Sequence, residues 1–241
     1  MSSTTSAGTP IEGAAALVTG GNRGFGRAMV DELLDRGAAK VYATARTPHT
    51  ASDERIVALV LDVTDDDSVA AAAHDASDVS IVVNNAGITL STPVLTAPLA
   101  DIQSELETNL FGPIRVARAF APILARHPSS SLVNVLSVLS WLAFGTGYGI
   151  SKAAAWSATN SMRLQLREQG TTVTALHVGY MDTDMTAHLD VPKADPREIA
   201  RQAADAILTG RYEILADELT RTVKSQLSQD LTNLYTQLAA A

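Results

Sequence analysis

The 241-residue sequence predicts one α/β domain built around a doubly wound parallel sheet of about seven strands. Short runs rich in β-branched residues alternate with longer amphipathic segments along the whole chain. Most of the short runs are continuously apolar, which is typical of parallel strands that helices cover on both faces. No linker, internal repeat or change of composition divides the chain. Residues 11–241 are therefore expected to form the domain, after a flexible polar tail over residues 1–10.

Each expected element follows from one of these two patterns. The apolar runs predict strands over residues 14–18, 40–45, 56–61, 79–83, 132–136, 172–178 and 213–216. The amphipathic segments predict helices over residues 25–36, 65–76, 98–126, 148–169, 195–209 and 217–238. This alternation favours crossover connections, and hence parallel pairing in a single sheet.

Composition excludes several classes of protein. A formal net charge of −8 and a pI near 5.0 argue against a general binder of nucleic acid or anionic membranes. No secretory signal opens the chain and no apolar run is long enough for a transmembrane helix. The absence of cysteine rules out disulfides and thiolate chemistry, and it suits a cytoplasmic location. The five histidines are scattered, so we expect ordinary surface or core residues and no metal site.

A glycine-rich turn lies between the first expected strand and the first expected helix. It runs Thr19-Gly20-Gly21-Asn22-Arg23-Gly24-Phe25-Gly26. Glycine suits a turn whose backbone adopts positive φ or passes close to a pyrophosphate. The helix that follows offers free N–H groups and its positive dipole end to phosphates. In this context a dinucleotide-binding turn is favoured over a purely structural one.

Tyr148 and Lys152 are four residues apart and project from one face of the expected helix. A tyrosine titrates near pH 10, and a nearby ammonium group can lower that pKa by about 1–3 units. The alternative is a packed tyrosine beside a solvated lysine. Lys152 is one of only four lysines and lies in a small, apolar segment, which favours a proton-transferring pair.

Several motifs together resemble the short-chain dehydrogenase/reductase family. They are the glycine turn, Asn84-Asn85-Ala86-Gly87 after the fourth strand, Asn109 in a helical stretch, Ser137 at the end of the fifth strand, and Tyr148-x-x-x-Lys152. The resemblance extends from residue 19 to about residue 185 and implies a Rossmann-like domain that holds both cofactor and substrate.

The resemblance also implies roles for these residues. Tyr148 would exchange a proton with the substrate oxygen, and Lys152 would also bind the ribose of the nicotinamide. Ser137 would polarise the carbonyl, and Asn109 would anchor a water that links Lys152 to solvent. The residues implied to bind the cofactor are Gly20, Asn22, Arg23, Gly24, Phe25, Gly26, Arg46, Asp62, Val63, Asn85, Ala86, Gly87, Tyr148, Lys152, Gly179 and Thr183.

The sequence departs from the family pattern at two places. Ser137 lies closer to Tyr148 than the family serine does, so Ser140 competes for its role, although Ser137 fits the strand end better. Val178-Gly179 replaces the usual Pro-Gly pair, whereas Thr183 still matches the residue that contacts the nicotinamide amide or phosphate.

The end of the second strand predicts NADP(H) as the cofactor. In doubly wound folds an acid at this point accepts a hydrogen bond from the ribose 2′-hydroxyl and repels a 2′-phosphate. Here Arg46 follows Ala45, and no acid occurs before Asp53. Arg23 in the glycine turn adds a second guanidinium for a phosphate, although two surface arginines are the alternative.

These observations predict a reductase that transfers hydride between NADPH and the carbonyl carbon of a small, mostly apolar substrate. The alternatives are an NAD-dependent alcohol dehydrogenase and a non-catalytic dinucleotide-binding sensor. Residues 182–195 are a candidate lid, and the long helices imply a homodimer or homotetramer by family resemblance. The residues expected around the substrate are Leu90, Val94, Trp141, Leu142, Phe144, Tyr180, Met181 and Met185.

Overall fold

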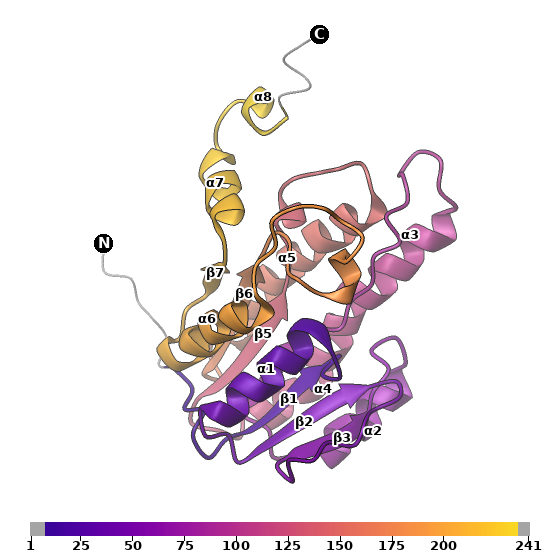
Figure 1. Cartoon of the computed structure of the whole chain (residues 1–241). Helices are drawn as coiled ribbons and strands as arrows, with labels where there is room; N and C mark the ends of the chain where they lie inside the picture. Colours follow the sequence, from indigo (N-terminus) through magenta and orange to yellow (C-terminus); the bar gives the residue numbers. More distant parts are fainter. Residues whose placement is uncertain (1–7, 236–241) are drawn as a thin grey trace.

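A computed structural model describes residues 8–235 and shows the expected seven-stranded parallel sheet, in the order β3-β2-β1-β4-β5-β6-β7 (Figure 1). All six strand pairs are parallel. The strands are β1 (Ala15–Thr19), β2 (Lys40–Ala45), β3 (Ile56–Val60), β4 (Ile81–Asn84), β5 (Ser130–Val135), β6 (Thr171–His177) and β7 (Glu213–Leu215).

Helices cover both faces of this sheet (Figure 1). One layer contains α1 (Gly24–Asp35) and α6 (Pro196–Thr209), and the other contains α2 (Asp66–Asp75), α4 (Gly112–Leu124) and α5 (Gly147–Leu166). Side chains alternate along β1, where Val18 joins the α1/α6 core and Leu17 joins the core on the other face. Burial on both faces explains why apolar residues predominate in the central strands.

The helix expected over residues 98–126 is interrupted. It consists of α3 (Leu99–Leu106), a π-helical segment (Glu107–Phe111) and α4. The π segment contains Asn109, whose side chain bonds the backbone of Ile88 outside the helix. Such single π turns are frequent at functional sites, and this one places Asn109 toward the loop after β4.

The prediction of one continuous helix over residues 217–238 is also wrong. The structure has α7 (Glu218–Gln226) and α8 (Leu231–Leu234), which extend from the edge strand β7 (Figure 1). The side chain of Asp230 accepts a hydrogen bond from the Thr232 N–H and begins the second helix, which the amphipathic pattern did not reveal. Residues 236–238 of the expected helix lie outside the described residues.

Residues 1–7 of the expected tail lie outside the described residues as well, but Thr9 is packed. Its N–H donates to the Ile207 carbonyl at 2.9 Å, and its hydroxyl bonds the Ser131 hydroxyl at 2.8 Å. A loose tail therefore does not include Thr9. None of the helices in the described part of the chain has the length and hydropathy needed to span a bilayer.

The order of the strands reverses between β1 and β4. At this switch point the carboxyl ends of adjacent parallel strands open a crevice, where doubly wound folds bind their ligands. The glycine turn follows β1, the segment 85–87 follows β4, and Ser137 follows β5. The sheet therefore brings three of the sequence motifs to one edge.

Candidate active site

The glycine turn has the conformation that its sequence predicts. Gly20 and Gly24 adopt φ angles of 68° and 55°, in the left-handed region that favours glycine. The side-chain amide of Asn85 donates to the carbonyl of Gly20 at 3.2 Å. A side chain at Gly26 would collide with that same carbonyl. These contacts hold the turn close to the segment after β4.

The N-terminus of α1 is open. Helices α2, α6 and α7 are each capped by an aspartate side chain, from Asp65, Asp195 and Asp217. At α1 the cap residue is Arg23, which makes no side-chain cap hydrogen bond, and the first turn contains no acidic residue. Free amides and an uncompensated dipole create a site for an anion, so the turn fits a pyrophosphate.

The two candidate arginines belong to segments that contact each other. The Asn22 side chain donates to the Thr47 carbonyl at 2.9 Å and so ties the glycine turn to the residues after β2. Both Arg23 and Arg46 are exposed at this junction. Arg23 forms an exposed ion pair of 2.8 Å with Asp184, a partner that sequence reasoning missed.

Asp62 and Val63 follow β3, beside these residues. Hydrogen bonds from the backbone and hydroxyl of Thr64, together with the nearby charge of Arg46, lower the pKa of the Asp62 carboxyl. Val63 is buried against Gly112. On the other side of the turn, the methyl group of Thr183 lies against Gly24. The structure thus gathers the expected cofactor-binding residues around the end of β1.

Asn109 organises the reacting centre. Its carboxamide accepts from the Ile88 N–H and donates to the Ile88 carbonyl, both at 2.9 Å, and also donates to the Ser151 hydroxyl at 2.9 Å. The Ser151 hydroxyl donates to the carbonyl of Tyr148. Asn109 therefore links the loop after β4 to the first turn of α5.

Tyr148 and Lys152 lie on one face of α5, as the spacing predicts. The Lys152 ammonium is buried, donates to the Val135 carbonyl at 2.9 Å and lies 5.6 Å from the centre of the Tyr148 ring. Gly87 is adjacent to both the Lys152 ammonium and the Asn109 carboxamide. The four proposed reacting residues thus converge from different segments.

The expected lowering of the Tyr148 pKa is wrong for this state of the protein. Burial raises the pKa of Tyr148 to about 12, against the lowering effect of a hydrogen bond to Ser137, and Glu105 raises it further. Burial also lowers the pKa of Lys152 to about 8. Desolvation disfavours the charged form of each group, so the phenol stays protonated near neutral pH.

The two candidate serines occupy different positions. Ser137 begins the 3-10 turn Val138–Ser140; its hydroxyl accepts from the Leu139 N–H at 3.1 Å and lies near enough to Tyr148 to lower the pKa of the phenol. The hydroxyl of Ser140 is buried and accepts from the Ser137 N–H at 3.4 Å. Ser140 therefore caps the backbone, and Ser137 is the serine next to the phenol. At the other departure from the family pattern, the Gly179 N–H donates to the side chain of Asp217 at 2.6 Å.

Sequence reasoning missed Glu105. Its side chain is fully buried, and one carboxylate oxygen accepts from the Leu90 N–H at 2.7 Å. The other oxygen lies against Gly147, with no hydrogen-bond partner among residues 8–235. The only sequence signal was its place one helical turn before Asn109, on the same face.

Only some of the residues expected around the substrate are exposed. Leu90, Phe144 and Met185 are exposed, whereas the ring of Trp141 stacks on His177. The Tyr235 hydroxyl near the C-terminus accepts from the Ala143 N–H, a contact that no sequence motif indicated. Backbone hydrogen bonds join the two ends of the candidate lid over residues 182–195: Asp182 donates to Ala194, and Ala194 donates to Tyr180. Among the described residues no group of acidic and histidine side chains is arranged to hold a metal ion.

Comparisons with known proteins agree with this geometry. Residues 14–193 match the family model of the short chain dehydrogenases. The chain is 33% identical over 214 residues to the 3-oxoacyl-(acyl-carrier-protein) reductase FabG of Vibrio harveyi. This alignment covers 79% of this chain and 88% of FabG.

Two solved structures extend the comparison. A short chain dehydrogenase from Burkholderia cenocepacia in complex with NADP has a TM-score of 0.86 and 34% identity, over 95% of this chain and 99% of that one. NADPH-bound carbonyl reductase from chicken fatty liver has a TM-score of 0.77 and 26% identity, over 83% and 93% of the two chains. The fold, the motifs and these matches together show that the chain belongs to the short-chain dehydrogenase/reductase family of oxidoreductases.

Proposed function

We propose that this protein reduces a carbonyl group to an alcohol with NADPH, and that Tyr148 is the proton donor. The observation that carries the proposal is the meeting of Tyr148 with the Ser137 hydroxyl, which is near enough to lower its pKa, and with the buried Lys152 ammonium, at the edge of the sheet that carries the open end of α1. The similarity to FabG and to the NADP- and NADPH-bound structures supports the same reaction class.

The chain's own residues supply binding and proton transfer. Ser137 and Tyr148 donate hydrogen bonds to the carbonyl oxygen and so stabilise the negative charge that develops on it. Bound NADPH supplies the hydride to the carbonyl carbon. Tyr148 then gives its proton to the oxygen, which completes the alcohol, and the Lys152 ammonium stabilises the tyrosinate that remains. A phenol that stays protonated near neutral pH favours the reducing direction.

The open end of α1 suits the pyrophosphate of the cofactor, and Arg23 and Arg46 suit its 2′-phosphate. We assign the adenine to Asp62 and Val63. The nicotinamide side is assigned to Asn85, Ala86, Gly87, Gly179 and Thr183, and the glycine turn contributes Gly20, Asn22, Gly24, Phe25 and Gly26.

The substrate side favours an uncharged carbonyl compound, because the exposed residues Leu90, Phe144 and Met185 are apolar. The similarity to FabG makes a 3-oxoacyl thioester one candidate within this class. We further propose a cytoplasmic homo-oligomer in which a second copy covers Phe111 and Leu164, exposed apolar residues on the π segment and α5.

An assay of NADPH consumption tests the proposed function. Apolar ketones, aldehydes and a 3-oxoacyl thioester are each offered with NADPH and with NADH, and the alcohol product is quantified. We expect NADPH oxidation with at least one member of the panel, in equal amount to the alcohol formed. Tight NADPH binding without turnover of any carbonyl would instead indicate a dinucleotide sensor.

Replacing Ser137 with alanine is expected to lower kcat by about ten- to a hundredfold, because the lost hydroxyl acts mainly on the developing oxyanion. Ser140→Ala is the matched control, since this hydroxyl faces the backbone of Ser137; it should change kcat by less than about threefold. Steady-state kinetics of both variants decide the assignment. The reverse order of effects would make Ser140 the active serine.

The pH dependence of catalysis should report the protonation of Lys152. Because burial lowers its pKa to about 8, the ammonium is present below that pH and is lost above it. The value of kcat/KM for NADPH, which follows groups of the free enzyme, should therefore fall as the pH rises through about 8. Tyr148, with a pKa of about 12, cannot cause this fall. A profile that stays flat to pH 10 would show that the charge on Lys152 is not needed.

A further inference from the structure

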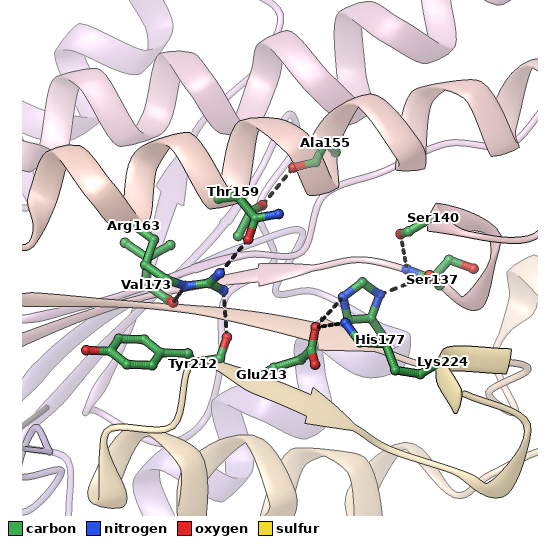
Figure 2. Close-up of polar contacts among 11 residues, drawn as sticks. Ser137, Ser140, Ala155, Thr159, Arg163, Val173, His177, Tyr212, Glu213 and Lys224 are labelled. Atoms are coloured by element: carbon green, nitrogen blue, oxygen red, sulfur yellow. Dashed lines mark hydrogen bonds and ion pairs between the residues drawn. The ribbon is translucent and has the colours of Figure 1, made fainter. Parts of the chain in front are cut away.

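A cluster of side chains around the buried His177 lies beside the backbone of Ser137. We call it the His177 cluster: it contains Trp141, Trp156, His177, Glu213 and Lys224, and Figure 2 shows its polar members. His177 ends β6, Glu213 begins β7 and Lys224 belongs to α7. None of these residues is part of the proton-transfer machinery described above.

His177 contacts the backbone of the proposed active serine. Its side chain is fully buried, and its Nδ1 atom lies 3.2 Å from the Ser137 carbonyl oxygen. Burial lowers the pKa of His177 to about 4, so the imidazole is neutral near pH 7. A carbonyl oxygen only accepts hydrogen bonds, and the single ring proton therefore belongs on Nδ1. His177 thus donates to Ser137.

The hydrogen bond from His177 to Ser137 lies just beyond the end of the regular sheet. Strand β5 ends at Val135, and backbone bonds from Leu136 and Val138 continue to β6. The carbonyl of Ser137 lies between them and accepts two hydrogen bonds, one from the Ser140 N–H at 3.0 Å within the 3-10 turn and one from the His177 ring. The Ser140 bond closes the 3-10 turn, and the His177 side chain adds the bond that ties the Ser137 peptide to β6.

Trp141 packs against the ring of His177. The Trp141 ring stacks on His177, with 3.8 Å between the ring centres and 22° between the planes, and it meets the edge of Trp156. Trp141 directly follows the 3-10 turn and begins the loop that leads to Phe144. The imidazole thus supports both the serine and the first residue of the substrate-side loop.

Charged residues from the C-terminal part of the chain complete the cluster. The Lys224 ammonium bonds the Glu213 carboxylate at 2.8 Å and lies 4.7 Å from the centre of the Trp141 ring. The same carboxylate oxygen lies 3.8 Å from His177 Nε2, which has no hydrogen-bond partner among the described residues. The other nearby cation, Arg163, is bonded to the carbonyls of Val173 and Tyr212 (Figure 2).

We propose that His177 is a positioning residue with two separable tasks: its Nδ1–H orients Ser137 for catalysis, and its ring face, backed by Lys224, fixes Trp141 and so shapes the substrate pocket. This inference rests on the proposed role of Ser137. The first task acts on the transition state and belongs to kcat, whereas the second acts on substrate binding and belongs to KM.

Two substitutions at the same position separate these tasks. His177→Phe keeps a flat ring against Trp141 and removes the donor, so kcat should fall about tenfold while KM changes by less than about twofold. His177→Asn places an amide N–H close to the former Nδ1 and removes the ring, so KM should rise about five- to tenfold while kcat changes by less than about threefold. A purely structural residue would instead give both variants the same loss.

A third substitution tests the connection to α7 without touching the imidazole. Lys224→Met should raise KM about threefold and leave kcat unchanged, because it loosens Trp141 and not Ser137. Lys40→Met is the matched control, since this lysine pairs with Asp78 at the opposite end of the sheet; it should change neither constant.

Tryptophan fluorescence gives a readout that does not depend on turnover. The chain contains two tryptophans and both belong to the cluster, so in a Trp156→Phe background the emission reports Trp141 alone. His177→Asn and Lys224→Met should each shift this emission. His74→Asn, on the exposed surface of α2, should not.

The outcomes separate this inference from the proposed function. Active wild-type enzyme, an impaired Ser137→Ala variant and wild-type values of kcat and KM for His177→Phe and His177→Asn would overturn the role of His177 alone. Equal losses in both His177 variants, or an unchanged Trp141 emission in Lys224→Met, would overturn the two-task assignment. If wild-type enzyme reduces no carbonyl, the proposed function itself fails. Thermal unfolding and NADPH titration of every variant confirm that the compared proteins are folded.

Discussion

Replacing Tyr148 with phenylalanine is expected to lower kcat for carbonyl reduction by at least about a hundredfold. The substitution removes the proposed proton donor, which is also one of the two hydroxyls proposed to hold the substrate oxygen, but it keeps the ring. Folding and NADPH binding should therefore survive. Single-turnover kinetics with saturating NADPH measure the chemical step directly.

Tyr212→Phe is the matched control for this variant. Tyr212 is exposed, and its ring, which phenylalanine retains, lies beside Arg163. The control should keep wild-type kinetics. Near-normal turnover in Tyr148→Phe would mean that another group protonates the product, and the mechanism proposed for Ser137, Tyr148 and Lys152 would have to be abandoned.

The second large effect concerns the choice of cofactor. Arg23 and Arg46 lie at one junction, and each can make charge-assisted hydrogen bonds to a 2′-phosphate. We expect NADPH to bind about a hundredfold more tightly than NADH. The preference is no larger than this because both arginines are exposed and the Asp184 carboxylate competes for Arg23. The preference should shrink as ionic strength rises, since only the phosphate charge is screened.

Arg46→Asp should reverse this preference. The change removes an attraction to the 2′-phosphate and adds a repulsion, while a carboxylate can accept a hydrogen bond from the free 2′-hydroxyl of NADH. Titration of both cofactors against wild type and variant measures the effect. Arg126→Asp, an exposed site after α4 at the amino end of β5, controls for the change in net charge. Equal wild-type affinities would show that the two arginines do not contact the phosphate.

Much of the fold follows from local sequence. The mostly apolar runs located all seven strands of the sheet, because a strand that helices cover on both faces buries most of its side chains. Gly20 and Gly24 marked the turn because their backbone conformation disfavours other residues. The four-residue spacing alone placed Tyr148 and Lys152 on one face of α5.

Other features depend on partners that are distant in sequence. The helix over residues 98–126 contains a π segment at Asn109, whose side chain bonds Ile88 in the loop after another strand. The C-terminal helix divides at Asp230, a cap that competes with a continuous amphipathic pattern. Ser137 and Ser140 are chemically identical, and only the 3-10 turn makes one face the phenol and the other the backbone.

The sequence by itself therefore determined the sheet and the conformation of the glycine turn, and it predicted the groups that we propose to react. The tertiary structure alone decided their protonation, since the depth of burial, and not the four-residue spacing, raises the pKa of Tyr148 and lowers that of Lys152. It also revealed Glu105 and His177, which belong to no motif and reach the site only through folding. The physical reason is the same in both cases: backbone preferences are local, whereas desolvation and long-range hydrogen bonds arise only when distant segments pack together.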